Sequence, residues 1–388
     1  MVPELGVGLV GYGLMGRAHS VAWTTAPQVF ELAARPTRVA ICDNNEDRVT
    51  RAARQVGWQN VEADWRALVA RDGVQVVDIC TPGDSHCEIA VAALEADKHV
   101  LCEKPLANTV EQAEEMAAVA RLAAERGVFA MVGFNYRRVP ALVLTRRLLR
   151  ENVLGDVRHV RASYLQDWLV DPEFPLVWRL QRERAGSGVL GDLGTHLIDL
   201  VRYLLEADIT AVSATTETFI SQRPGPLGPS SGLSITKSGE ERQPVSVDDA
   251  ALFLARFSSG TLASFEATRF ATGHKNALRL ETNGERGTLG FDLERMNELD
   301  VYELGDDLAG FRRVLVTEST HPYIDAWWPP GHILGWEQTL VHEAHDLLTA
   351  IAGGHQPQPS FEDGLEVQRV LDAVESSSVS GGWVSPRS

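Results

Sequence analysis

Short apolar runs alternate with amphipathic helical patterns along the first third of the chain. The runs end in Gly, Asp or polar residues next to Pro, and the segments between them repeat apolar residues every three or four positions. Continuous apolar strands separated by helices predict a parallel sheet covered on both faces. The predicted strands are Leu5–Val10, Arg38–Cys42, Val74–Cys80, Lys98–Cys102 and Val128–Val132, and the predicted helices are Glu46–Val56, Ser85–Ala96 and Thr109–Glu125, with Ser85 and Thr109 as N-caps.

The second half of the chain has a different pattern, in which strand-like runs follow one another with hairpin-like breaks at 258–260 and 283–284. This clustering is typical of an antiparallel sheet. We expect two domains, residues 1–134 and 135–388, with C-terminal helices that can pack back on the first domain. The expected elements are strands Val157–Gln166, Val247–Phe257, Thr261–Ala267, Ala277–Thr282 and Gly287–Phe291, a loop at Ser221–Pro244 rich in Ser, Gly and Pro, and helices Gly335–Ile351 and Glu362–Ser376.

Composition narrows the possible partners and the compartment. The 388 residues carry 36 Lys+Arg against 53 Asp+Glu, a net charge of −17, which disfavours nucleic acid and anionic membranes as partners. The N-terminus lacks a basic n-region, and no apolar stretch approaches the roughly 20 residues of a membrane span. None of the four cysteines forms a C-x-x-C pair, so we expect buried, reduced thiols in a cytoplasmic protein.

A glycine motif joins the first predicted strand to a helix. In Gly11-Tyr12-Gly13-Leu14-Met15-Gly16 the first glycine suits a tight turn, the second allows close approach of a pyrophosphate, and the third lets helix pack on strand. Asp43 ends the second predicted strand, where a carboxylate binds a ribose diol and repels a 2′-phosphate. NAD is therefore favoured over NADP, although the nearby Arg48 leaves NADP open. Asp43 follows Gly16 by 27 residues, and Pro27–Arg38 is interpreted as an insertion that absorbs the excess.

Candidate catalytic side chains follow other strands and begin a later helix. Ligands bind at the carboxyl ends of such strands, where Lys104 stands next to Pro105. Asp192 and His196 are four residues apart at the start of a helical pattern, which places both on one face. His342 and His345 are three residues apart, whereas the zinc motif needs four, so no metal site is predicted.

Taken together, these motifs resemble one family. The glycine motif, Thr81-Pro82 with His86, Glu103-Lys104-Pro105, and Gly191-Asp192 with Gly194-Thr195-His196 resemble the Gfo/Idh/MocA nicotinamide-dependent sugar and cyclitol oxidoreductases over essentially the whole chain. The resemblance implies an α/β Rossmann domain, a C-terminal α+β domain with a large open, mostly antiparallel sheet, and homo-oligomers (dimers or tetramers) formed through that sheet. It also implies that Lys104, Asp192 and His196 are catalytic and that Glu103 lies near the nicotinamide ribose. The expected NAD-binding residues are Gly11, Tyr12, Gly13, Leu14, Met15, Gly16, Asp43, Thr81, Pro82, His86, Glu103, Lys104 and Asn135.

The tryptophans indicate a sugar as the substrate. Of nine Trp, five lie in two short stretches on either side of the predicted catalytic helix, and one of these stretches is a Trp-Trp-Pro-Pro-Gly-His loop that is poor core material. Sugar rings stack their C–H faces on such side chains. The expected substrate-binding residues are Lys104, Tyr136, Arg137, Gln166, Trp168, Asp192, His196, His332 and Trp336.

Within this family, the Trp-Trp-Pro-Pro-Gly-His loop and Tyr136-Arg137-Arg138 look most like members that oxidise a ring hydroxyl of a glucose-like sugar. The resemblance therefore implies an NAD-dependent dehydrogenase that oxidises a ring secondary hydroxyl of a pyranose-type sugar, at C3 of levoglucosan or a related glucoside. In the hypothesis, His196 removes the hydroxyl proton, Lys104 stabilises the alkoxide and Asp192 orients His196. Whether Lys104 or His196 accepts the proton stays open. The alternatives are an inositol 2-dehydrogenase, an NAD-dependent glycoside hydrolase and a non-catalytic NAD and sugar sensor.

Overall fold

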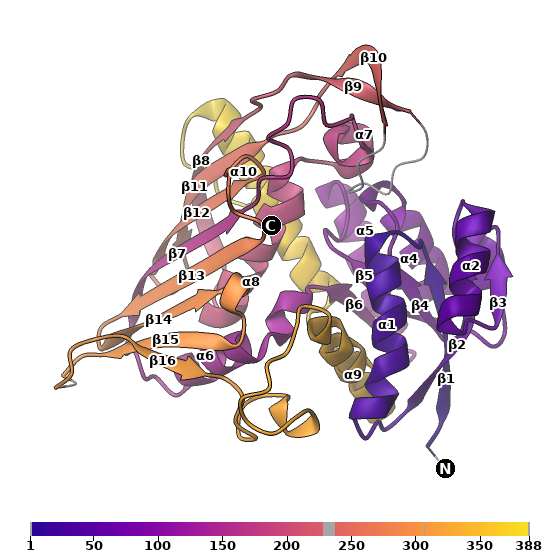
Figure 1. The fold of residues 1–388 in the computed structure, drawn as a ribbon, viewed down its shortest axis with the longest axis horizontal. Coiled ribbons are helices and arrows are strands. Elements are labelled where there is room, and N and C mark those ends of the chain that lie inside the picture. The colour runs from indigo at the N-terminus through magenta and orange to yellow at the C-terminus, as the bar shows by residue number, and fades with distance from the viewer. Residues whose placement is uncertain (1, 228–236, 306, 387–388) are drawn as a thin grey trace.

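The computed structural model describes residues 2–227, 237–305 and 307–386. Two sheets dominate it, one formed within residues 4–133 and one within residues 157–315, with helices packed around and between them (Figure 1). This arrangement confirms the predicted fold class, a parallel α/β domain followed by a domain with a large mixed sheet.

The first sheet is six-stranded and parallel, in the order β3-β2-β1-β4-β5-β6. Its centre is almost wholly apolar because helices cover both faces. Its strands are β1 (Glu4–Val10), β2 (Arg35–Cys42), β3 (Asn60–Glu62), β4 (Val76–Ile79), β5 (His99–Glu103) and β6 (Ala130–Gly133), and its helices are α1 (Leu14–Val29), α2 (Glu46–Val56), α3 (Trp65–Val69), α4 (His86–Glu95) and α5 (Val110–Ala124).

The second sheet is eight-stranded, in the order β16-β15-β14-β13-β7-β12-β11-β8, and every pair is antiparallel except β12 with β7. One face packs on helices, which lie behind the sheet in Figure 1. Its strands are β7 (Val157–Leu165), β8 (Ile209–Glu217), β11 (Ala250–Phe257), β12 (Leu262–Thr268), β13 (Ala277–Gly284), β14 (Gly287–Asp292), β15 (Glu298–Glu303) and β16 (Arg312–Leu315), and the helices of this half are α6 (Pro140–Arg150), α7 (Arg182–Ala185), α8 (Thr195–Leu205), α9 (Gln338–Gly353) and α10 (Phe361–Ser380).

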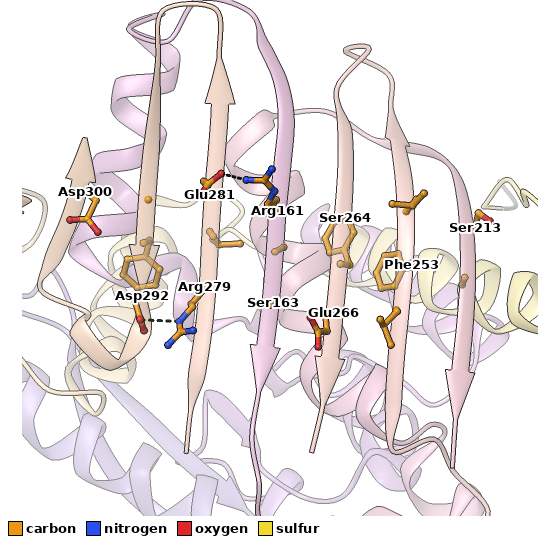
Figure 2. A pocket seen from close by; sticks show the side chains of 18 of the residues that line it. Arg161, Ser163, Ser213, Phe253, Ser264, Glu266, Arg279, Glu281, Asp292 and Asp300 are labelled. Atoms are coloured by element: carbon orange, nitrogen blue, oxygen red, sulfur yellow. Dashed lines mark hydrogen bonds and ion pairs between the residues drawn. The ribbon is translucent and has the colours of Figure 1, made fainter. Parts of the chain in front are cut away.

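The opposite face of this second sheet, which we call the open face, mixes apolar and charged side chains. Figure 2 shows a pocket of about 940 Å³ on this face, lined by outward-pointing residues of several neighbouring strands. Leu252 and Leu254 on β11 are exposed here, while Arg161 pairs with Glu281 and Arg279 pairs with Asp292.

Helix α9 returns to the first domain. Its apolar side, including Leu340 and Leu347, belongs to the same buried cluster as Leu9 and Trp23 of the Rossmann half. A second buried cluster is continuous from Val132 at the end of β6 into the second half. The boundary at residue 134 therefore crosses a shared core, and the division into two domains there stays a prediction.

Several local predictions were wrong. The stretch Ser221–Pro244 contains two paired strands, β9 (Gln222–Leu227) and β10 (Lys237–Pro244), instead of a loop alone, and residues 228–236 lie outside the described residues. A two-stranded ribbon has unpaired edges, which tolerate Pro224 and Pro226. The stretch Pro27–Arg38 contains the end of α1, which includes Pro27, and the start of β2 at Arg35, and its interpretation as an insertion stays a prediction.

The two predicted N-caps have different outcomes. The Thr109 side chain accepts a hydrogen bond from the Gln112 N–H, as an N-cap does. The Ser85 hydroxyl instead donates to Thr81 and to the Pro82 carbonyl and does not cap α4. Strands β3, β8, β15 and β16 were not predicted, because each lacks a sustained apolar run. Within the described residues, no helix combines the length and apolar character needed to cross a membrane.

Candidate active site

The glycine turn after β1 has the geometry of a phosphate-binding loop. Gly11 adopts φ +92°, and a Cβ there would lie 2.8 Å from the Cys80 carbonyl oxygen. A Cβ on Gly16 would come within 1.9 Å of the Gly11 carbonyl oxygen, so the chain itself requires both glycines. A Cβ on Gly13 would meet nothing, which leaves open space at the N-terminus of α1. Such space beside a helix N-terminus fits the pyrophosphate of a dinucleotide. Tyr12, Leu14 and Met15 lie in the same turn, and Leu14 is exposed.

Asp43 lies at the end of β2 beside this turn. Its Oδ2 accepts the Tyr12 backbone N–H at 2.7 Å, and its Oδ1 accepts the Asn45 N–H at 2.8 Å. Arg48 donates to Oδ1 at 2.5 Å. The carboxylate is thus fixed next to the glycine turn, where it fits a ribose diol, and it already engages the cation that could have bound a 2′-phosphate.

The ends of β4 and β5 are tied together by His86. Its Nδ1 lies 3.0 Å from the Pro105 carbonyl oxygen and its Nε2 lies 2.9 Å from the Thr81 carbonyl oxygen. The ring is buried, so His86 holds the Thr81-Pro82 and Glu103-Lys104-Pro105 segments in place. His86 was predicted to bind the cofactor, whereas both of its ring nitrogens contact backbone carbonyl oxygens of the protein.

Lys104 and Asp192 meet across the two domains. The Lys104 Nζ donates to the Asp192 backbone carbonyl at 3.0 Å and lies 3.4 Å from Asp192 Oδ1. Arg179 and Arg269 approach the other carboxylate oxygen at 3.9 and 4.0 Å. Burial opposes the charged carboxylate, but these cations outweigh it and lower the pKa of Asp192 to about 2. The site therefore holds one carboxylate among three cations.

His196 lies one helical turn after Asp192. Asp192 belongs to a π-helical turn, Leu190–Gly194, which α8 continues, and such turns are frequent at functional sites. Burial and the Lys104 ammonium hold the pKa of His196 well below its ordinary value, against the pull of Asp192. The ring packs on Tyr136 at 4.6 Å between centroids, and its Nδ1 is buried without a hydrogen-bond partner among the described residues. His196 is thus a buried imidazole that stays neutral and can act as a base.

The predicted orientation of His196 by Asp192 is not what the structure shows. In the described parts of the chain no hydrogen bond joins the two side chains, and the Asp192 carboxylate faces Lys104 and the arginines instead. Aromatic packing against Tyr136 fixes the imidazole.

A directed chain of hydrogen bonds lines the side of the site formed by the second sheet. Tyr164 donates to the Asn276 side-chain oxygen at 2.7 Å and accepts from Tyr136 at 2.9 Å. Gln166 donates to the same Asn276 oxygen at 2.8 Å and accepts the Trp168 indole N–H at 2.9 Å. Tyr136, Gln166 and Trp168, predicted from the sequence, are therefore brought together. Asn276, Tyr164 and Arg269 were not predicted, since they lie on separate strands and loops.

A buried arginine, Arg223, holds the segment that carries Trp168. Arg223 on β9 donates to the backbone carbonyls of Leu169, Asp171 and Phe174. The Arg269 guanidinium lies against the Trp168 ring at 5.7 Å. The ring is therefore presented beside the cations that surround Asp192.

The tryptophans of the Trp-Trp-Pro-Pro-Gly-His loop divide into different environments. The half-buried Trp336 lies near the Tyr136 hydroxyl, so it borders the site. Trp327 packs against Phe30 and donates to His342, which anchors the loop on the first domain. Trp328 is 61% exposed, and the exposed His332 contacts the Pro329 carbonyl of its own loop. The structure thus brings Trp336, but not His332, against the predicted site residues.

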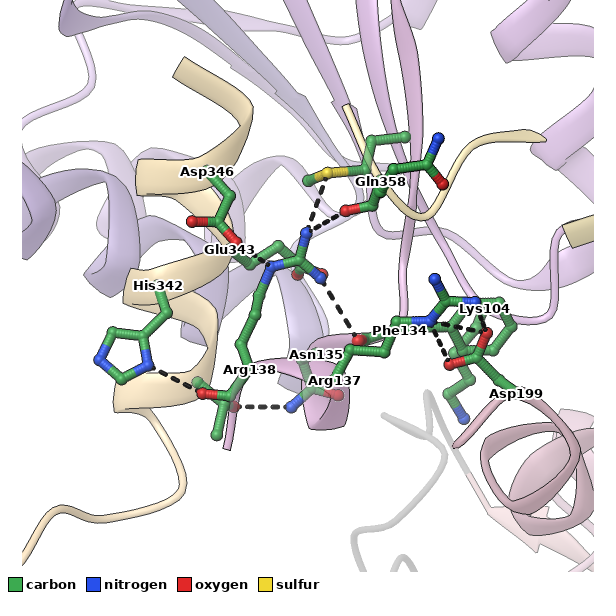
Figure 3. A network of polar contacts seen from close by, with 12 residues as sticks. Lys104, Phe134, Asn135, Arg137, Arg138, Asp199, His342, Glu343, Asp346 and Gln358 are labelled. Carbon is green, nitrogen blue, oxygen red and sulfur yellow. Dashed lines mark hydrogen bonds and ion pairs between the residues drawn. The ribbon is translucent and has the colours of Figure 1, made fainter. Parts of the chain in front are cut away.

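Arg137 and Asn135 are each hydrogen-bonded to a side chain outside the predicted cluster. Figure 3 shows the Arg137 guanidinium on the Asp199 carboxylate, a buried pair whose shortest contact is 2.6 Å. Arg137 was expected to bind substrate, and its structural pairing with Asp199 corrects that expectation, because a buried guanidinium must be paired. The Asn135 amide donates to Thr339 on α9 at 2.8 Å, which joins the end of β6 to the C-terminal helix.

The comparisons with known proteins agree with this geometry. Residues 5–134 match the model of the oxidoreductase family with an NAD-binding Rossmann fold, and residues 143–290 match the GFO/IDH/MocA C-terminal domain. The chain is 42% identical to levoglucosan dehydrogenase of Pseudarthrobacter phenanthrenivorans over 98% of each protein.

Solved structures cover the whole chain as well. An oxidoreductase domain protein from Kribbella flavida superposes with a TM-score of 0.94 at 55% identity, covering 100% of both chains. A levoglucosan dehydrogenase in complex with NADH and levoglucosan superposes with a TM-score of 0.92 at 40% identity, covering 99% of this chain and 100% of the other. The chain therefore belongs to the Gfo/Idh/MocA family of oxidoreductases, and residues 5–134 are the NAD-binding Rossmann domain of that family.

Proposed function

We propose that this protein oxidises the C3 hydroxyl of levoglucosan, or of a related glucoside, with NAD as hydride acceptor. The observation that carries the proposal is the meeting of Lys104, Asp192 and a neutral His196 between the nucleotide turn and an aromatic wall. The levoglucosan dehydrogenase relative, similar over nearly its full length, supports the choice of substrate.

The cofactor site is formed by the first domain. The Gly11–Gly16 turn would hold the pyrophosphate, Asp43 the ribose diol of the adenosine half, and Glu103 the nicotinamide ribose. When bound, NAD supplies the acceptor for the hydride that leaves the carbinol carbon.

The protein side chains supply the proton chemistry. Neutral His196 takes the hydroxyl proton, because its lowered pKa keeps the imidazole unprotonated at neutral pH. The Lys104 ammonium lies beside it and stabilises the alkoxide oxygen as the proton leaves. Asp192 holds that ammonium through both its backbone and its carboxylate oxygens, which fixes the position of the charge.

Aromatic and amide groups suit the ring of a sugar. Trp168 and Trp336 provide faces for its C–H groups, and Gln166 offers polar contacts to its hydroxyls. Levoglucosan carries no charge, so its binding depends on such stacking and on hydrogen bonds.

The proposal is tested by measuring NADH formation across levoglucosan, glucose, methyl glucosides, xylose, myo-inositol and scyllo-inositol, with NADP as the cofactor control. Levoglucosan or a glucoside should give the highest kcat/KM, and the product should be the 3-keto sugar. A higher kcat/KM for an inositol would overturn the proposal and indicate an inositol dehydrogenase. NAD-dependent cleavage of a glycoside without net NADH would indicate a hydrolase, and sugar binding without NADH formation would indicate a sensor.

The catalytic assignment has its own test. Lys104→Ala should lower kcat by about a thousandfold, because it removes the charge beside the developing alkoxide, while NADH binding stays near normal. Lys98→Ala is the matched control, since Lys98 precedes the opposite end of β5. Near-wild-type turnover in Lys104→Ala would contradict the assignment.

We further propose that a second copy of the chain covers the open face of the second sheet. The exposed Leu252 and Leu254 lie there among charged side chains that pair with one another, such as Arg161 with Glu281. A face of this kind can pack against the same face of a second copy of the chain. Leu254→Glu should dissociate the oligomer, which light scattering after gel filtration measures. A wild-type protein that runs as a monomer at micromolar concentration would contradict this proposal.

A further inference from the structure

A group of buried charges lies between the glycine turn and Lys104. We call it the His19 network, and it consists of His19 on α1, Asp78 on β4, Glu103 on β5 and the indole of Trp23. The exposed fractions of His19, Asp78 and Glu103 are 2%, 0% and 4%. Buried charge in the middle of a parallel sheet costs free energy that apolar residues would avoid, so its presence calls for an explanation.

The hydrogen bonds that His19 and Trp23 make in the network all end on carboxylate oxygens. The His19 Nδ1 lies 3.0 Å from both Asp78 carboxylate oxygens, and its Nε2 lies 3.0 Å from Glu103 Oε1. The Trp23 indole donates to Asp78 Oδ2 at 2.7 Å. Carboxylates only accept, so both ring nitrogens donate and the ring is an imidazolium bridging two acids.

The far end of the network reaches the proposed catalytic lysine. Glu103 Oε2 accepts the backbone N–H of Lys104 at 3.1 Å, while Oε1 faces His19. The Glu103 side chain is therefore held between His19 and Lys104, whose ammonium contacts Asp192. Helix α1, which begins at the glycine turn, is thereby fixed to the end of β5.

The groups around His19 favour its charged form. Burial opposes the charge, but Asp78 outweighs it and raises the pKa of His19 well above its ordinary value. Cys80 donates weakly to Asp78 and, since burial raises the pKa of its thiol, stays neutral. Glu343 of α9 also faces the network; burial raises its pKa to about 8, against the effect of Arg138 and His19. A neutral thiol and a ring committed to two acids make a poor metal site.

We propose that His19 is a positioning residue, which fixes Glu103 and, through the Glu103–Lys104 contact, the placement of Lys104 relative to the nucleotide turn. The inference rests on the proposed function in one respect, namely that Lys104 acts in catalysis. Its part concerning Glu103 and the cofactor is independent of which sugar is oxidised.

The first test compares His19→Gln with Trp23→Phe. Glutamine has no charge and can donate to only one of the two acids at a time, so Glu103 is released. In His19→Gln we expect kcat to fall by about tenfold or more and NADH affinity, followed by fluorescence, to weaken by about threefold or more. Trp23→Phe removes a bond to Asp78 without touching Glu103, so it should lower Tm and leave both quantities near wild type. An equal loss of kcat and affinity in Trp23→Phe would overturn the proposal.

The second test separates positioning from charge balance. His19→Gln leaves Asp78 and Glu103 without their shared cation, which lowers Tm, and His19→Gln combined with Asp78→Asn removes one of the two charges and should recover much of that Tm. If His19 positions Glu103, kcat and NADH affinity stay reduced in the double variant. Recovery of both together with Tm would show a merely structural role and overturn the proposal. If the wild type binds NADH but oxidises no sugar, the proposed function fails, and NADH affinity in the same variants still decides the role of His19.

Discussion

Replacing Asp192 with Asn removes the carboxylate charge that faces Lys104, Arg179 and Arg269. The substitution keeps the size of the side chain and its backbone contact to Lys104, so it changes mainly the electrostatics of the site. Because the three cations are then left without their common partner, we expect the folded protein to be less stable.

The magnitude follows from the pKa of Asp192, which the cations lower from 3.8 to about 2 despite burial. At about 1.4 kcal/mol per pH unit, this difference stabilises the folded protein by about 2.5 kcal/mol. With an unfolding entropy of about 2.1 cal/mol/K per residue, the variant should lose about 3 °C of Tm. The folded pKa is the lower one, so the contribution is complete above about pH 4 and is lost as pH falls towards about 2.

The assay is thermal unfolding of both proteins at several pH values. Asp97→Asn is the matched control, because Asp97 forms an exposed pair with Arg126 and has a positive φ that Asn tolerates. An exposed pair contributes about 0–1 kcal/mol, so the control should lose about 1 °C or less. A variant Asp192→Asn as stable as wild type near pH 7, or a Tm difference that grows as pH falls, would refute the reasoning.

Three further predictions concern the reaction itself. Because His196 has a pKa well below its ordinary value, kcat/KM should not fall between about pH 7.5 and 6.5, where an ordinary imidazole gains its proton, and a decline with a midpoint near 6.5 would contradict a neutral base. Asp43→Ser should lower kcat/KM for NAD by about 100-fold through loss of charge-assisted hydrogen bonds, and should raise relative use of NADP because Arg48 is released; an unchanged cofactor ratio would contradict this. Trp336→Ala should raise KM for the sugar by about tenfold with little change in NADH affinity. The control Trp328→Ala, at an exposed residue, should change neither quantity. Equal losses of sugar and NADH binding in Trp336→Ala would show that Trp336 is a core residue that does not contact the sugar.

The structure corrects one part of the hypothesis drawn from spacing. Four residues on an α-helix would put Asp192 and His196 on one face, yet the Asp192 carboxylate, in a π-helical turn, faces Lys104 and the two arginines instead. Asp248, which lies in a loop far along the chain, accepts the N–H groups of Gly188 and Leu190 and so holds the start of this turn. Sequence spacing contains no information about that contact.

The Rossmann domain and its nucleotide turn could be predicted from local patterns in the sequence. Periods of apolar residues report burial directly, and the glycines and Asp43 are read from local sterics and charge, so motifs at strand ends could be placed without a structure. Which side chains meet in the site could not be predicted in this way. Arg137 turned out to pair with Asp199, while Arg269 and Asn276 joined the site. His19 is a further case, because a histidine on a helix and an aspartate in an apolar strand become one network only when the sheet brings them within 3.0 Å. Contacts between residues far apart in the chain depend on packing, which no local pattern encodes.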